Sequence, residues 1–154
     1  MKPIREHTIE LEVPDSDIDQ LGHASNIAYL RWVQDVAIDH SAAVGLDLPT
    51  YRERGAVFVV LRHEIDYLRS ALRGDHLLVR TWVSSASAAT CRRETEIKRT
   101  SDATVVARGS TTWGFVDIVS GRPRRIPDDI IEAFGSPERK VVRAITKDDD
   151  SADP

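Results

Sequence analysis

The sequence predicts an α+β protein in which one antiparallel sheet of about five strands wraps around a single long helix. The first observation behind this prediction is a change of hydrophobic period near Ser25, from the alternation typical of a strand to the three- or four-residue step typical of a helix. The second is that residues 56–118 contain further strand patterns separated by short turns, which favours antiparallel pairing. A single helix with so many apolar positions can be buried only by a sheet that curves around it.

Each element has its own local signal. The first strand is expected over residues 4–13, where apolar and polar side chains alternate. The helix follows from about Ser25 to Val44, and Gly45 stands where a helix-ending glycine belongs. The remaining strands are expected over residues 56–68, 76–84, 91–99 and 104–118. A short helix with Pro127 in its first turn completes the set.

Length, composition and charge limit the class of protein. A chain of 154 residues suits one domain, which we expect over residues 1–140, followed by a disordered acidic tail over 141–154. The net charge of -4 gives no electrostatic reason to expect nucleic acid as a partner. Cys91 is the only cysteine, which excludes an intrachain disulfide. The longest apolar run, residues 56–61, is too short to cross a bilayer, and no apolar signal core stands at the start. We therefore expect no membrane insertion and a cytoplasmic location.

Three aspartates at alternate positions, in the segment VPDSDIDQLGHASNIAYLRW (residues 13–32), raise the question of a metal site. A calcium loop that began at Asp15 would need glycine at its sixth position and a glutamate at its twelfth. These positions hold Gln20 and Asn26, and no helix precedes the loop. The pattern therefore does not favour calcium.

A transition-metal site would use Asp17, Asp19 and His23, but this spacing is a weak signal and no second cluster of His and Asp accompanies it. We therefore expect no metal ion. Aspartate is also common in turns and at helix starts, where its carboxylate accepts hydrogen bonds from free backbone N–H groups. This is the role that we expect for Asp15 and Asp17.

Asp19 differs from its two neighbours because of the residues that follow it. Gly22 allows a close backbone turn, and Ser25 or Asn26 begins a helix whose first N–H groups carry a partial positive charge. Such N–H groups can stabilise an oxyanion, while a nearby carboxylate attacks an acyl carbon or activates water. The pattern therefore favours a site for acyl transfer.

The segment DIDQLGHASNIAYLRW resembles the D-x-D-x-x-G-H-x-x-N-x-x-Y motif of the hotdog-fold acyl-CoA thioesterases, in the 4-hydroxybenzoyl-CoA thioesterase-like family. The resemblance covers about residues 4–135, and EIDYLRSALRGDHLLVRTWV is similar to the second-strand segment of that family. It implies a hotdog fold and an enzyme that hydrolyses the thioester of an acyl or aroyl coenzyme A to the free acid and coenzyme A. It implies no cofactor, since coenzyme A is part of the substrate.

The resemblance also implies roles for four residues of the loop. Carried over by position, Asp19 is the catalytic aspartate, acting as general base towards water or as nucleophile. The backbone N–H of Asn26 polarises the thioester carbonyl, and Gly22 permits the turn. His23 either contacts the carbonyl and orients the aspartate, or only orders the loop through hydrogen bonds.

Further residues are candidates for contacts with the substrate. Arg69, Arg92 and Arg93 could bind the phosphates of coenzyme A, which require cationic partners. Glu64 is expected either to reach the site of a neighbouring subunit or to lie on a solvated strand face. Unpaired edge strands predict self-association as a dimer or tetramer, with the substrate bound between subunits.

Two departures from the family pattern leave the subfamily open. Many relatives carry glutamate and arginine along the helix where this chain has Gln34 and Ala37. The acyl chain preference, and the choice between coenzyme A and acyl carrier protein thioesters, are also left open. Two alternative functions stand beside hydrolysis: a non-catalytic acyl-CoA-binding module, and a hotdog enoyl-CoA hydratase or dehydratase.

Overall fold

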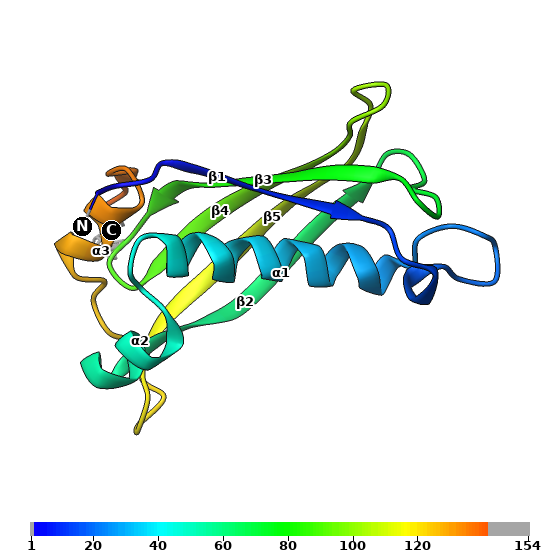
Figure 1. The fold of residues 1–154 in the computed structure, drawn as a ribbon. Helices are drawn as coiled ribbons and strands as arrows, with labels where there is room; N and C mark the ends of the chain where they lie inside the picture. The colour runs from blue at the N-terminus through cyan, green and yellow to red at the C-terminus, as the bar shows by residue number, and fades with distance from the viewer. Residues whose placement is uncertain (1, 142–154) are drawn as a thin grey trace, which may run out of the picture.

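A computed structural model describes residues 2–141, which form one six-stranded sheet with a long helix packed against one of its faces (Figure 1). The strands are β1 (Glu6–Glu12), β2 (Ala56–Tyr67), β3 (His76–Ala86), β4 (Thr90–Arg99), β5 (Val105–Asp117) and β6 (Glu138–Arg139). The helices are the 3-10 turn η1 (Asp15–Asp17), α1 (Asn26–Ala43), α2 (Leu48–Arg54) and α3 (Asp128–Ala133). The main strands follow the order β1-β3-β4-β5-β2 and pair antiparallel, while β6 pairs parallel with β3. The predicted α+β arrangement, a sheet wrapped around one long helix, is confirmed.

The structure contains elements that the hydrophobic pattern does not predict. Helix α2 is seven residues long, and two turns are too few to show a helical period. Its ends nevertheless carry clear local signals. The side chain of Asp47 accepts a hydrogen bond from the N–H of Thr50 at 3.0 Å, and Gly55 ends the helix at a left-handed φ of 75°. The acidic tail expected over residues 141–154 lies outside the described residues except for Val141.

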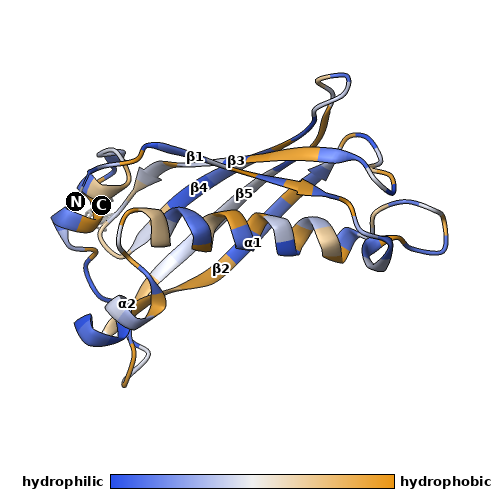
Figure 2. Ribbon diagram, viewed as in Figure 1, coloured by the Kyte–Doolittle hydropathy of each residue, from blue (hydrophilic) through white to orange (hydrophobic). Residues whose placement is uncertain are grey.

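Helix α1 places two kinds of surface on opposite sides. The side chains buried against the sheet recur at three- and four-residue spacing: Ala28, Tyr29, Trp32, Val33, Val36, Ala37 and His40. Figure 2 shows the corresponding mixture of hydrophobic and hydrophilic residues along the ribbon of α1. The other side of the helix is not wholly polar, because Ile27 is 75% and Ile38 63% exposed. Of these two residues, Ile38 also lines the cavity described below.

The core consists of two apolar clusters separated by buried polar side chains. The first cluster packs around the N-terminal half of α1, and the second lies beyond its C-terminal end. Each of β3, β4 and β5 contributes residues to both clusters, with polar side chains at the positions between them. These buried polar residues are Thr81, Arg93, Thr95 and Thr111. His40 meets them from α1, because its Nδ1 lies 2.9 Å from Nη1 of Arg93.

Strand β2 forms an open edge of the sheet. Within the described residues it pairs only with β5, so its other side keeps unpaired backbone groups. The edge carries apolar side chains as well, and Val59, Leu61 and Tyr67 are all exposed. A long apolar edge strand of this kind invites pairing with another strand. None of the helices among the described residues is both long and apolar enough to span a membrane.

Candidate active site

The carboxylate of Asp19 is held in place by its own loop. Its Oδ1 accepts hydrogen bonds from the backbone N–H of Leu21 at 2.9 Å and of His23 at 3.2 Å. The N–H of Asp19 in turn donates to the carbonyl of His23 at 2.8 Å. Gly22 makes this turn possible, because its φ of 79° lies in the left-handed region that side chains disfavour. Asp19 is thus exposed but oriented, and its second carboxylate oxygen accepts no hydrogen bond from the described residues.

The same loop leads directly into the start of α1. Ser25 caps the helix, since its Oγ accepts the N–H of Ala28 at 3.2 Å. The N–H of Asn26 has no acceptor among the described residues, as expected in the first turn of a helix. An antiparallel bridge between Ile18 and Ala24 closes the loop. The loop therefore joins a free carboxylate oxygen to a helix start with an open N–H group and a partial positive charge.

The other two aspartates of the segment have structural partners. Asp17 is buried, its carboxylate pairs with Arg31, and its carbonyl accepts the N–H of Ser25 at 2.8 Å. Asp15 forms an ion pair with Arg73 at 2.7 Å. Both carboxylates are thus paired with arginine side chains, Asp17 with Arg31 and Asp15 with Arg73. The expected role is therefore corrected, because neither carboxylate accepts a hydrogen bond from a backbone N–H of the described residues.

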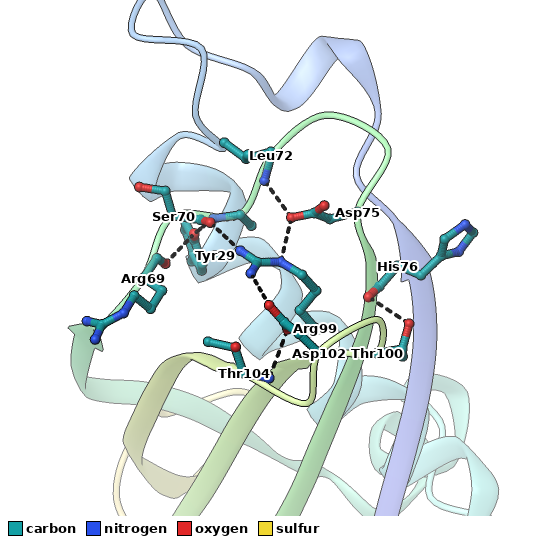
Figure 3. A network of polar contacts seen from close by, with 11 residues as sticks. Tyr29, Arg69, Ser70, Leu72, Asp75, His76, Arg99, Thr100, Asp102 and Thr104 are labelled. Carbon is teal, nitrogen blue, oxygen red and sulfur yellow. Dashed lines mark hydrogen bonds and ion pairs between the residues drawn. The ribbon is translucent and has the colours of Figure 1, made fainter.

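A second segment, residues 67–75, supports the loop from the side (Figure 3). Arg99 holds this segment, because its Nε donates to Asp75 at 2.9 Å and its Nη2 donates to the carbonyl of Ser70 at 2.7 Å. The carbonyl of Ala71 accepts the N–H of Ala24 at 2.8 Å, which ties the segment to the loop. Arg99 therefore positions the segment that contacts the loop of Asp19, through an ion pair and a hydrogen bond to a backbone carbonyl.

The imidazole of His23 turns towards this supporting segment. Its Nδ1 lies 3.3 Å from Oγ of Ser70. The contacts between His23 and Asp19 are made by the backbone of His23 instead. Of the two roles left open by the sequence, this arrangement favours ordering of the loop.

Apolar side chains surround the entrance to this site. Tyr67 donates a hydrogen bond from its hydroxyl to the carbonyl of Asn26 at 3.4 Å, so the C-terminal end of β2 lies beside the start of α1. The exposed apolar residues of the loop, the first helical turn and the segment are Leu21, Ile27, Leu68 and Leu72. These exposed apolar side chains flank the loop that carries Asp19.

The candidate arginines for coenzyme A occupy three different environments. Arg69 is exposed next to the loop, and its guanidinium donates only to the carbonyl of Leu68 at 2.7 Å. Arg92 is exposed and paired with Glu94 at 2.9 Å. Arg93 is only 5% exposed and lies in the polar layer of the core. Its burial corrects the expectation of a phosphate contact, which requires a cation at the surface.

A β-bulge in β2 decides which side chain faces the helix. The register with β5 shifts between Val60 and Arg62, so that His63 rather than Glu64 points to the inner face. Nδ1 of His63 lies 2.9 Å from Oγ1 of Thr111, and its Nε2 is buried without a partner among the described residues. Burial lowers the pKa of His63 below its ordinary value.

Glu64 lies on the outer face and forms an ion pair with Arg62 at 2.6 Å. Its exposure is compatible with both roles considered for Glu64, a solvated strand face and a contact with a neighbouring subunit. The alternation of apolar and polar residues does not reveal a bulge. The inward orientation of the neighbouring His63 therefore could not be predicted from the sequence.

A cavity of about 550 Å³ lies between the C-terminal half of α1, helix α2 and the strands β2, β3, β4 and β5. Its walls are mainly apolar, and Ile38, Leu46, Phe58 and Trp113 are among the lining residues. Arg93 also lines the cavity, whereas Asp19 of the same chain does not. The sequence did not predict this cavity, because its walls come from segments far apart along the chain.

Solved structures of known proteins share this fold. The chain matches a 1,4-dihydroxy-2-naphthoyl-CoA thioesterase from Synechocystis with a TM-score of 0.77 and 22% identity, over 84% of this chain and 95% of that one. It matches the DHNA-CoA thioesterase from Staphylococcus aureus with a TM-score of 0.76 and 20% identity, over 85% of this chain and 89% of that one. The predicted hotdog fold is therefore confirmed.

The sequence profile of the Thioesterase-like superfamily matches residues 13–134, and the chain belongs to this superfamily of thioester hydrolases. It is 25% identical over 131 residues to the chloroplastic acyl-acyl carrier protein thioesterase ATL2 of Arabidopsis thaliana, which covers 84% of this chain and 68% of the relative. It is also 25% identical over 120 residues to the chloroplastic palmitoyl-acyl carrier protein thioesterase of Gossypium hirsutum. That match covers 72% of this chain but only 29% of the longer relative.

Proposed function

We propose that this protein hydrolyses acyl-coenzyme A thioesters, with Asp19 as the catalytic carboxylate. The observation that supports the proposal is the loop that orients the Asp19 carboxylate and leads directly into the start of α1 at Asn26. The N–H of Asn26 donates a hydrogen bond to the thioester oxygen and stabilises the negative charge that develops there. Asp19 either takes a proton from the attacking water or attacks the carbonyl carbon itself. The reaction consumes water and releases a carboxylic acid and coenzyme A, and it requires no cofactor.

The exposed Arg69 is the best-placed cation for the coenzyme A phosphates. It lies on the segment that contacts the loop through Ala24 and Ala71, and the hydroxyl of Tyr29 in α1 donates to its carbonyl at 3.5 Å. It forms no ion pair with a described carboxylate, so its guanidinium is available to a ligand. The free Cys91 thiol fits a reducing compartment, which agrees with a cytoplasmic location.

The open edge of β2 supports a dimer in which each site combines two subunits. Along α1, the cavity-lining residues run from Gln34 to Ala42, eight to sixteen residues after Asn26, which is about 12–24 Å at the usual helical rise. Within one chain the cavity therefore extends away from the loop of Asp19, and Asp19 does not line it. Tyr67 places the start of α1 at the C-terminal end of β2, while Val57 and Val60 place the cavity at its N-terminal end. Antiparallel pairing of two β2 edges would bring Asp19 of one subunit towards the cavity of the other.

The substitution Asp19→Asn tests the proposed chemistry. It keeps the size of the side chain and an oxygen that can accept the loop hydrogen bonds, so the fold should survive. We expect kcat for a panel of aliphatic and aromatic acyl-CoAs to fall at least about a hundredfold, with a modest change in KM. The assay follows the released thiol. Near-normal turnover by a folded Asp19→Asn protein would remove Asp19 from the mechanism.

The same assay separates the alternative functions. Binding of acyl-CoA without any release of thiol would identify a non-catalytic binding module. Hydration of crotonyl-CoA, without hydrolysis of the panel, would identify a hydratase.

A mixed-subunit experiment tests the composite site. Asp19→Asn chains lack the carboxylate, and Ala42→Trp chains have the cavity filled from an exposed helix position. In a mixed dimer, one of the two sites then combines an intact Asp19 with an open cavity. Random mixing of two inactive variants should therefore restore about a quarter of wild-type turnover. No recovery would show that each subunit contains its complete site.

A further inference from the structure

The cavity contains a buried cation that no protein anion neutralises. Arg93 lines the cavity, is 5% exposed and forms no ion pair with any carboxylate among residues 2–141. Burial lowers the pKa of Arg93 to about 10, so the guanidinium stays charged at neutral pH. An isolated charge inside a protein is strongly unfavourable unless a partner neutralises it.

The acidic groups around Arg93 do not supply this partner. Burial raises the pKa of Cys91 to about 11 and that of Tyr51 to about 12. Both groups are therefore neutral at pH 7. His40 is neutral as well, because burial and the charge of Arg93 lower its pKa to about 4. Its Nε2 lies 2.7 Å from the carbonyl of Ile4, which fixes the proton there and leaves Nδ1 to accept from Arg93.

Within the described residues, only one nitrogen of the Arg93 guanidinium, Nη1, donates hydrogen bonds. Nη1 donates to Nδ1 of His40 at 2.9 Å and to Oγ1 of Thr81 at 3.2 Å. Nε and Nη2 donate to no acceptor among the described residues. The ring of Phe134, 5.3 Å from the guanidinium carbon, offers a face but no lone pair. The contacts of Nη1 therefore position the Arg93 side chain, while Nε and Nη2 are left to donate to a ligand in the cavity.

A second donor without a partner lies on the neighbouring strand. Trp113 lines the same cavity, and its indole N–H is buried with no acceptor among the described residues. Cys91 on β4 is the register partner of Trp113 on β5, so Arg93 and Trp113 are diagonal neighbours on the inner face. Diagonal neighbours in a sheet lie about 7–8 Å apart, within reach of one another's long side chains. Both unused groups are donors, and both require an acceptor.

We propose that the cavity binds an acyl group whose far end is a carboxylate, held by the guanidinium of Arg93. The apolar walls would enclose the methylene or aromatic part of the acyl group, and Arg93 would neutralise the distal charge. A neutral hydroxyl or carbonyl could accept a hydrogen bond but would leave the buried charge uncompensated. This inference rests on the proposed function and narrows its substrate class to thioesters of dicarboxylic acids. Hydrolysis is unchanged: water adds its oxygen to the carbonyl carbon, the C–S bond breaks, and coenzyme A leaves as the thiol.

The test compares acyl-CoAs that end in a carboxylate with methyl-ended acyl-CoAs of matched length, such as adipoyl-CoA with heptanoyl-CoA. We expect kcat/KM of the wild-type protein to favour the carboxylate series by about tenfold or more, the usual effect of one charge-assisted contact. In Arg93→Met the preference should disappear or reverse. This variant replaces the buried charge by an apolar side chain of similar length, a change that proteins tolerate well. The control is Arg108→Gln, at an exposed position of β5, which should keep the preference.

A binding measurement separates this inference from the proposed hydrolysis. Calorimetric titration with free adipate should detect binding to the wild-type protein and to Arg108→Gln, and none to Arg93→Met. Equal hydrolysis of both acyl series would overturn the inference and leave the thioesterase proposal intact. If no acyl-CoA is hydrolysed, the proposed function fails. Adipate binding that depends on Arg93 would then still support the carboxylate site, and absence of binding would overturn it.

Discussion

Asp17 and Asp19 carry the same side chain two positions apart but have opposite environments. Asp17 is 8% exposed and its carboxylate is occupied by Arg31. Asp19 is exposed, and the backbone of its loop holds one carboxylate oxygen while the other stays free. Sequence reasoning separated the two through Gly22 and the helix start, which are adjacent in the chain. It could not find Arg31 as a partner, because that contact depends on how the loop folds over the first turns of α1.

The contrast predicts different effects for two conservative substitutions. Asp17→Asn removes the charge that pairs with Arg31, so we expect the free energy of unfolding to fall by about 1–2 kcal/mol, or about 2–8 °C in Tm. Asp15→Asn removes an exposed pair with Arg73 and should change stability by less than about 0.5 kcal/mol. Thermal unfolding measures both. An Asp17→Asn protein with unchanged Tm but no turnover would instead assign the chemistry to Asp17.

His40 gives the protein a predictable loss of stability in acid. Its pKa is about 4 in the folded protein, below the ordinary value of 6.5. Between pH 6.5 and 4, His40 is therefore protonated in the unfolded chain but neutral in the folded chain. Protonation favours the unfolded chain, so the free energy of unfolding decreases as the pH falls through this range. At pH 5 the loss amounts to about 2 kcal/mol relative to pH 7.

Urea unfolding at pH 7 and pH 5 measures this loss, and His40→Gln is the matched variant. Its amide can still accept from Arg93 and donate to Ile4 but does not titrate. We expect the variant to lose less stability than the wild-type protein between the two pH values. An identical loss in both proteins would show that other groups cause it.

At the scale of elements, hydrophobic period located the main strands and the long helix because each is long enough to show it. The hydrophobic period cannot locate the bulge in β2. One extra residue there exchanges the inner and outer faces for all later residues of the strand. That reversal turned His63 inwards and Glu64 outwards. Strand β6 was also missed, because two residues carry no period at all.

Strand β6 offers a test of how much a very short element contributes. The N–H of Lys140 donates to the carbonyl of Ala86, and Arg139 donates to the carbonyls of Ser87 at 3.3 Å and Ile126 at 2.8 Å. A chain that ends after Ser136 loses all these contacts, and we expect its Tm to fall by several degrees. A chain that ends after Val141 keeps them and is the matched control. Equal Tm values for the two truncated chains would show that β6 adds no stability.

At the scale of the whole molecule, the candidate site has a local part and a distributed part. The local part, the loop with Asp19 and Asn26, is contiguous in sequence and was therefore predictable. The cavity is assembled from α1, α2 and four strands, so no short motif describes it. Arg93 illustrates this limit. The sequence predicts it as a surface cation, but among the described residues of β3, β4 and β5 it is the buried charged side chain between the two apolar clusters. Only the three-dimensional arrangement distinguishes it from its neighbour Arg92.

The open edge of β2 and the separation of Asp19 from the cavity lead to a prediction about assembly. We expect the wild-type protein to have at least twice the 17.2 kDa mass of one chain in light scattering at assay concentration. Leu61 is 58% exposed on this edge strand and does not line the cavity. Leu61→Lys should leave each chain folded but place charges where two edges meet, giving a monomer.

If each site combines two subunits, this monomer should lose turnover about as severely as Asp19→Asn. Ser101→Lys adds the same charge in the exposed turn between β4 and β5 and should change neither mass nor turnover. A wild-type mass of 17.2 kDa would overturn the dimer. A monomeric Leu61→Lys protein with full activity would keep the chemistry but place the whole site within one chain, where an acyl group would have to span the length of α1 between Asp19 and Arg93.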